Sequence, residues 1–86
     1  MKLLYFAWLR QRTGIAEEEA MPPPGVKTVR DLIEWLRARG PGSAAAFEDL
    51  KAVRVAVNQE HAEFGAAIGP GDEIAFFPPV TGGRDD

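Results

Sequence analysis

Cysteine is absent from the 86 residues of this chain, and histidine and serine occur once each, as His61 and Ser43. Without cysteine the chain has no disulfide, no thiolate metal site and no cysteine nucleophile. His61 lacks convergent partners at the spacing of a metal or acid–base site, so we predict a solvated or structural role for it. Ser43 lacks the histidine and acid that would activate it. The sequence therefore predicts no self-sufficient active site.

Strong positive charge and long apolar runs are also missing. A net charge of −3 with mixed signs argues against nucleic acid as a main partner. No apolar run approaches the roughly 18 residues of a membrane span. The apolar start of the chain lacks the small-residue cleavage site of a signal peptide. We expect one cytoplasmic domain that binds no cofactor of its own and inserts into no membrane. Glu17–Glu19 is expected to be a solvated edge rather than a metal site.

Apolar periodicity predicts one main helix among several short strands. Val29, Leu32, Ile33 and Leu36 follow helical spacing behind a capping pair, Thr28 and Asp31. Gly40 and Pro41 are predicted to end this helix. The other predicted elements are a strand over 2–9 buried on both faces, an edge strand over 17–21, a short helix over 43–50 capped by Ser43, a strand over 53–57, an irregular strand over 61–64 and a last strand over 73–77.

This order predicts an α+β roll of the ubiquitin-like, or β-grasp, type, with a mixed sheet of four or five strands packed on the main helix. The first and last strands are the most apolar and are expected to be neighbours at the sheet centre. Alternation along the last strand places Phe76 in the core and Phe77 outside it. We expect a domain over 1–77 and an extended tail over 78–86.

The composition of the tail is typical of an extended segment that inserts into another protein, rather than of the end of a folded domain. Pro78 and Pro79 stiffen it, and Gly82 and Gly83 have no side chains, so their backbone could enter a narrow channel. We interpret the segment as one that delivers a backbone group into the active site of another protein. A frayed chain end without function is the alternative.

Three segments carry a resemblance to a known family. They are Leu4–Ala7 with Arg10, Val55–Gln59 and, most specifically, Gly71–Gly83, which contains Phe-Phe-Pro-Pro-Val-Thr-Gly-Gly. Over residues 1–83 the chain resembles the small subunits of molybdopterin synthase, ubiquitin-like sulfur carriers of molybdenum cofactor biosynthesis. Sulfur carriers of the thiamine pathway share the fold and the two glycines but generally lack a Phe-Pro-Pro segment before the glycines.

The resemblance implies a chemistry for Gly83, with Gly82 beside it. A ubiquitin-activating-like adenylyltransferase would adenylate the terminal glycine carboxylate and would itself hold the ATP. Sulfur would then replace AMP to give a thiocarboxylate. The tail would enter a pocket of the large catalytic subunit, in a heterotetramer, and give its sulfur to precursor Z. We expect an exposed apolar patch to dock there, formed by Phe6, Phe77, Pro78, Pro79 and Val80 together with Thr81.

Arg84, Asp85 and Asp86 depart from the family pattern, because they leave Gly83 in a peptide bond instead of a carboxylate. Removal of the three residues after Gly83, an inactive or divergent chain, and a cloning remnant are the alternatives. Two other functions also stay open: sulfur carriage for the thiamine, cysteine or tRNA thiolation pathways, and a β-grasp interaction module whose tail has no chemical use.

Overall fold

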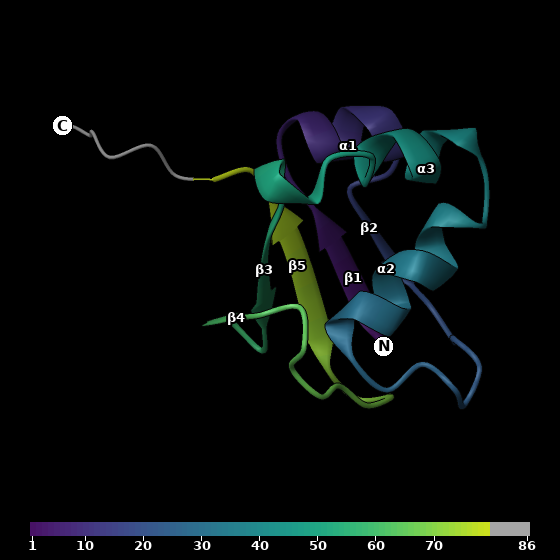
Figure 1. The fold of residues 1–86 in the computed structure, drawn as a ribbon, viewed down its shortest axis with the longest axis vertical. Coiled ribbons are helices and arrows are strands. Elements are labelled where there is room, and N and C mark those ends of the chain that lie inside the picture. The colour runs from purple at the N-terminus through teal and green to yellow at the C-terminus, as the bar shows by residue number, and fades with distance from the viewer. Residues whose placement is uncertain (80–86) are drawn as a thin grey trace, which may run out of the picture.

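A mixed sheet with helices packed on one face forms the fold of residues 1–79, the part of the chain that this computed structural model describes (Figure 1). In chain order the elements are β1 (Lys2–Tyr5), α1 (Trp8–Thr13), β2 (Glu17–Glu19), α2 (Val29–Arg37), α3 (Pro41–Ala46), the 3₁₀ turn η1 (Leu50–Ala52), β3 (Arg54–Val57), β4 (Glu60–Ala62) and β5 (Glu73–Phe77). The strand order is β2-β1-β5-β3-β4. The central strands β1 and β5 are parallel, and the other pairs are antiparallel. The predicted β-grasp fold, with its first and last strands adjacent, is confirmed.

The first strand is shorter than the predicted 2–9 and is not buried on both faces. It ends at Tyr5, and its side chains alternate between the core and the outer face. Leu3 and Tyr5 are buried, whereas Lys2 is exposed and Leu4 is half-buried. The prediction was wrong because the apolar run combines a strand with the first turn of a helix.

The chain reverses at Ala7, which has φ 56° and ψ −133°. The N–H of Leu9 donates to the carbonyl of Phe6 at 3.1 Å, which closes a tight turn. Helix α1 begins at Trp8, buries Leu9 and ends at Gly14, whose φ of 82° is a left-handed cap. Gly14 thus serves as the C-cap of this helix. An alanine at positive φ is uncommon, so nothing in the sequence indicates this reversal.

Helix α2 starts as predicted. The hydroxyl of Thr28 accepts the N–H of Asp31 at 3.1 Å, and the carboxylate of Asp31 accepts the N–H groups of Lys27 at 3.1 Å and Thr28 at 3.2 Å. These bonds, that to Lys27 foremost, lower the pKa of Asp31. The predicted apolar stripe is buried: Val29, Leu32, Ile33 and Leu36. The helix ends at Arg37 with Ala38 as its C-cap, before the predicted stop.

Gly40 and Pro41 begin the next helix rather than ending the previous one. Gly40 is the N-cap of α3 and Pro41 occupies its first turn, where a missing N–H costs nothing. Ser43 therefore lies inside the helix, and its predicted role as cap is wrong. A Cβ on Gly42 would lie 2.6 Å from the carbonyl oxygen of Arg12, so only glycine allows α3 to approach α1 so closely.

The short strands differ from their predicted bounds for reasons outside the strands. β2 stops at Glu19 instead of 21: the N–H of Ala20 still donates to the carbonyl of Met1 at 2.8 Å, but Pro22, Pro23 and Pro24 follow and supply no N–H. β4 occupies 60–62 rather than 61–64. The carbonyl of Phe64 accepts the N–H of Arg30 at 2.8 Å, so this residue belongs to the contact with α2.

The acidic run in β2 is not solvated throughout. Glu18 faces the helices, where its carboxylate accepts the hydroxyl proton of Tyr5 at 2.8 Å and pairs with the guanidinium of Arg39 at 2.9 Å. The pKa of Tyr5 is raised far above its usual range. Burial of the phenol is the larger cause and its hydrogen bond to Glu18 the second. The neighbours Glu17 and Glu19 are exposed, as predicted. Glu18 therefore ties β1, β2 and the end of α2 together.

The β3–β4 hairpin turns at Asn58 and Gln59, with φ of 52° and 71°. The amide of Asn58 donates to the carboxylate of Asp72 at 3.1 Å and accepts the N–H of Glu73 at 3.0 Å. The same carboxylate accepts the N–H of Gly69 at 2.8 Å. The hairpin is thereby fastened to the loop that starts β5. The bonds from Asn58 and then Gly69 lower the pKa of Asp72.

We expect this carboxylate to add acid sensitivity to the fold. Because the pKa of Asp72 is lower in the folded chain, its stabilising effect is present above the ordinary aspartate value of about 3.9 and is lost as pH falls through the folded value. Asp72→Asn should therefore lose less stability on acidification than the wild type. Urea unfolding at a series of acidic pH values measures this difference. Glu48→Gln, at an exposed site, is the control. Equal pH slopes for Asp72→Asn and the wild type would contradict the assignment.

Candidate functional site: the open sheet face at the base of the tail

The sheet has one covered face and one open face. The helices cover the face that carries Leu3, Tyr5, Val55, Ile74 and Phe76, all buried. Side chains alternate along a strand and strand partners share a face, so the pairing registers define the opposite surface, which we call the open sheet face. Its members are Lys2, Leu4, Phe6, Glu17, Glu19, Arg54, Ala56, His61, Glu73, Ala75 and Phe77.

Two phenylalanines lie on the open sheet face where β5 passes into the tail. Phe76 is fully buried and Phe77 is half-buried, which confirms the predicted faces of the last strand. Phe6 is 49% exposed, an unusual state for so large an apolar side chain. Its N–H donates to the carbonyl of Phe76 at 3.1 Å, which holds it beside the end of β5. Phe6 and Phe77 therefore form an apolar surface at the base of the tail.

His61 and Arg54 flank Phe77, and sequence reasoning gave neither of them a part in the site. The imidazole of His61 meets the ring of Phe77 edge-on, with centroids 5.5 Å apart and planes at 61°. Arg54 is the direct strand partner of Phe77. Its Nη1 donates to the carbonyls of Lys51 at 3.0 Å and Val53 at 3.1 Å, which fixes the guanidinium at the rim of this surface. Only the pairing of β3 with β4 and β5, a non-local feature, could have revealed the grouping.

Of the remaining predicted site residues, Pro78 and Pro79 follow β5 without regular secondary structure and are half-buried. Val80, Thr81, Gly82 and Gly83 lie outside the described residues. The docking and chemical roles assigned to all of these positions stay predictions, as does the division between a domain over 1–77 and a tail over 78–86.

The described residues bring together no catalytic or metal-binding constellation. Within residues 1–79 no three His, Cys, Asp or Glu side chains are placed to hold a metal ion. None of the helices there has the length and apolar character that a bilayer crossing demands. The open sheet face offers shape, apolar area and fixed charges, which are the elements of protein recognition rather than of catalysis.

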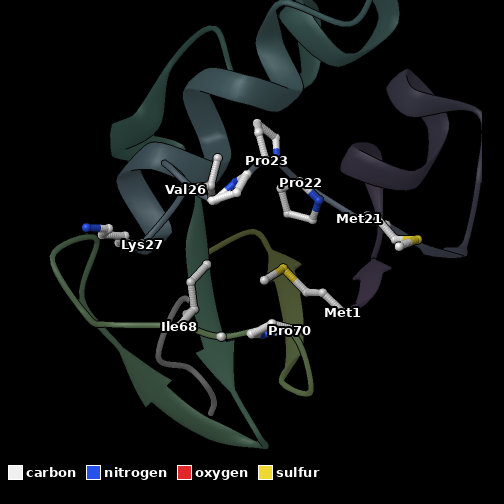
Figure 2. Close-up of a pocket in the computed structure, with 11 residues that line it drawn as sticks. Met1, Met21, Pro22, Pro23, Val26, Lys27, Ile68 and Pro70 are labelled. Atoms are coloured by element: carbon white, nitrogen blue, oxygen red, sulfur yellow. The ribbon is translucent and has the colours of Figure 1, made fainter.

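A pocket of about 360 Å³ lies at the opposite end of the sheet from the tail, before the first residues of β1 and β5. Figure 2 shows Met1, Met21, Ile68 and several prolines around it, with Lys27 at its edge. Apart from Lys27 its lining is apolar or backbone, so it holds no acid–base pair. The pocket is not part of the tail site.

Comparison with known proteins now identifies the family. The model of the ThiS family matches residues 3–83, which include both the fold and the two glycines of the tail. The chain belongs to the ThiS family. Nearly its whole length is matched, so the membership applies to the complete fold rather than to the C-terminal motif alone.

Several relatives carry one name. A molybdopterin synthase sulfur carrier subunit of Escherichia coli is 42% identical, over 96% of this chain and 99% of its own length. The human protein of the same name is 35% identical, over 96% of this chain and 93% of its own.

Solved structures agree in fold. A candidate molybdopterin converting factor subunit 1 of Pyrococcus furiosus has a TM-score of 0.73 and 35% identity, covering 92% of this chain and 95% of its own. Small archaeal modifier protein 1 of Haloferax volcanii has a TM-score of 0.72 and 30% identity, covering 93% and 97%.

Proposed function

We propose that this chain is the sulfur carrier subunit of a molybdopterin synthase. The observation that carries the proposal is the family match over residues 3–83, which ends at Gly83. The relatives that share the molybdopterin synthase name, at up to 42% identity over nearly the whole chain, support this pathway over others. The Phe-Phe-Pro-Pro segment before the two glycines agrees with the assignment to molybdopterin synthesis.

In the proposed reaction Gly83 carries the sulfur. A carboxylate oxygen of Gly83 attacks the α-phosphorus of ATP, which is held by an adenylyltransferase partner, and pyrophosphate leaves. A sulfur donor on the partner side then displaces AMP from the acyl group and leaves a thiocarboxylate. This chain needs no cysteine for the step, because the sulfur ends on a backbone carbonyl carbon. In the synthase the sulfur of the thiocarboxylate bonds to precursor Z, water then hydrolyses the carbonyl carbon–sulfur bond, and the chain returns to a carboxylate.

The open sheet face is the surface that we assign to docking on the large catalytic subunit. Phe6 and Phe77 lie at the root of the tail, so a partner that covers them also receives the segment that follows. Exposed apolar patches rimmed by polar groups commonly mark such interfaces. Pro78 and Pro79 would limit the directions in which the tail can leave this surface.

A second candidate function is attachment to other proteins as a modifier. The similarity to small archaeal modifier protein 1, at 30% identity and a TM-score of 0.72, supports the modifier function as a second candidate. Both functions begin with adenylation of Gly83. They differ in the nucleophile that follows, which is sulfur for a carrier and a lysine amine for a modifier.

Intact-mass spectrometry separates these functions. Residues 1–83 are incubated with the activating enzyme, ATP and a sulfur source, with a second reaction that lacks ATP as the control. We expect a mass gain equal to the exchange of one oxygen for sulfur, only when ATP is present. A ladder of isopeptide conjugates in place of the thiocarboxylate would support the modifier function. No ATP-dependent change would contradict both.

A further inference from the structure

The open sheet face is electrically polarised, because the charges on its β2 side and on its β3 side have opposite signs. On the β2 edge Glu17 and Glu19 point to this face, since Glu18 between them points to the helices. Lys2 Nζ lies 3.9 Å from the carboxylate of Glu17, and both side chains are largely exposed. Lys2 on β1 and its β5 partner Glu73 lie on the same face, so three glutamates and one lysine leave this part of the face with a formal charge of −2.

On the other side of the face, β3, next to the edge strand β4, carries a fixed cation, Arg54. Two backbone carbonyls, those of Lys51 and Val53, hold Nη1 of Arg54, so part of its side-chain entropy is already lost before any partner arrives. Among residues 1–79 no carboxylate lies within 4.0 Å of this guanidinium. Its other N–H groups form no hydrogen bond within residues 1–79 and stay available as donors next to Phe77, the strand partner of Arg54. A planar guanidinium in this state suits bidentate binding of a carboxylate.

The two charged edges are far enough apart to act separately. β2 and β3 are separated by β1 and β5, which is three strand spacings or about 14 Å. This exceeds the Debye length of about 8 Å at physiological salt, so each edge interacts with its own counterpart. The central strands between them carry the apolar side chains of Leu4, Ala75 and Phe77, with Glu73 at the start of β5. Closing a partner over this centre removes water and strengthens both edge interactions.

We propose that the open sheet face docks a protein surface of the opposite polarity. That surface carries an acidic side chain that Arg54 binds, an apolar centre that covers Phe6 and Phe77, and a basic side chain that faces Glu17 and Glu19. The opposite charges at the two ends admit one orientation, since turning the partner around would bring like charges together. This inference rests on the proposed function, in which the partner is the large synthase subunit and a fixed orientation aims the tail at its pocket.

Charge reversal at each edge tests the polarity. Binding of residues 1–83, the form whose tail the proposed channel admits, to the large synthase subunit of the same organism is measured by calorimetry at low and high salt. We expect Arg54→Glu to weaken binding by about tenfold or more at low salt, and the double change Glu17→Lys with Glu19→Lys to weaken it comparably. Both losses should shrink at high salt, because screening removes them.

Matched controls lie on α2, on the other side of the molecule. Arg37→Glu makes the same charge change there as Arg54→Glu, and Glu34→Lys reverses one glutamate, half the charge change of the double variant; the two residues pair only with each other at 3.4 Å. We expect both to bind within about twofold of the wild type, because exposed pairs of this kind contribute little. Urea unfolding of every variant shows whether a loss of binding comes from a loss of fold.

Three outcomes distinguish the possible errors. If the edge variants bind no worse than the controls while Phe77→Ala loses affinity, the docking face is correct and its polarity is wrong. If neither the edge variants nor Phe77→Ala lose affinity, the open sheet face is not the docking surface and the inference fails, while thiocarboxylation of Gly83 is untouched. If residues 1–83 without any substitution do not bind the large subunit at all, the proposed function fails.

Discussion

A chain that ends at Gly83 should support molybdopterin formation, whereas the 86-residue chain should give none. In the longer chain the nitrogen of Arg84 occupies the position of the carboxylate oxygen that must attack ATP. An amide cannot accept the adenylyl group, so the loss is one of chemistry and not of affinity. A channel that admits two glycines would also exclude the arginine side chain. The missing carboxylate and the steric exclusion of Arg84 both predict that the 86-residue chain has no activity, rather than a reduced one.

Three forms of the chain test this expectation in a reconstituted synthase assay: residues 1–86, residues 1–83, and residues 1–83 with Gly83→Ala. Only the second should be fully active. The added methyl group of the third should impair it strongly, because it lies at the constricted end of the tail. Equal activity of the alanine form and the glycine form would mean that the channel is wider than proposed.

Phe76 and Phe77 should respond to alanine in opposite ways. Phe76 is fully buried, with its ring 4.9 Å from that of Phe47 and 5.9 Å from that of Tyr5. Phe76→Ala should lower the free energy of unfolding by about 3–5 kcal/mol, since it leaves a large cavity. Phe77→Ala should cost about 1 kcal/mol of stability but weaken binding to the large subunit by about tenfold or more, as expected for an aromatic anchor.

Urea unfolding and calorimetric binding measure the two effects on the same preparations. Each variant serves as the control for the other, since both remove one phenyl ring from the same strand. If Phe77→Ala kept its partner affinity while a folded Phe76→Ala lost it, our assignment of the two faces would be wrong.

Local sequence patterns predicted those parts of the fold that depend on local interactions. The capping pair Thr28 and Asp31 and the stripe behind it fix α2 within a few residues of chain. Alternation in β5 separated Phe76 from Phe77, because the side chains of a strand have a period of two. The central pairing of β1 with β5, which is not local, followed from the predicted β-grasp arrangement and agrees with the apolar character of both strands.

The parts that sequence reasoning missed depend on backbone conformation or on distant contacts. Helix α1 begins after the chain reverses at Ala7, whose positive φ cannot be predicted from the residue type. The short strand β4 ends where Phe64 contacts α2. The rim of the candidate site was missed for the same reason, since His61 and Arg54 meet Phe77 only through pairing between strands. Alternation along one strand predicts which side chains share a face of the sheet, but it does not predict which residues of neighbouring strands lie beside them.

The central claim is that sulfur travels on Gly83 as the chain terminus. The intact mass of the chain recovered from an active synthase reaction tests it most directly. We predict that every molecule that has turned over ends at Gly83, as a carboxylate or a thiocarboxylate, and that any 86-residue molecule is unmodified. Full activity of a preparation in which Arg84, Asp85 and Asp86 are still attached after turnover would contradict the account.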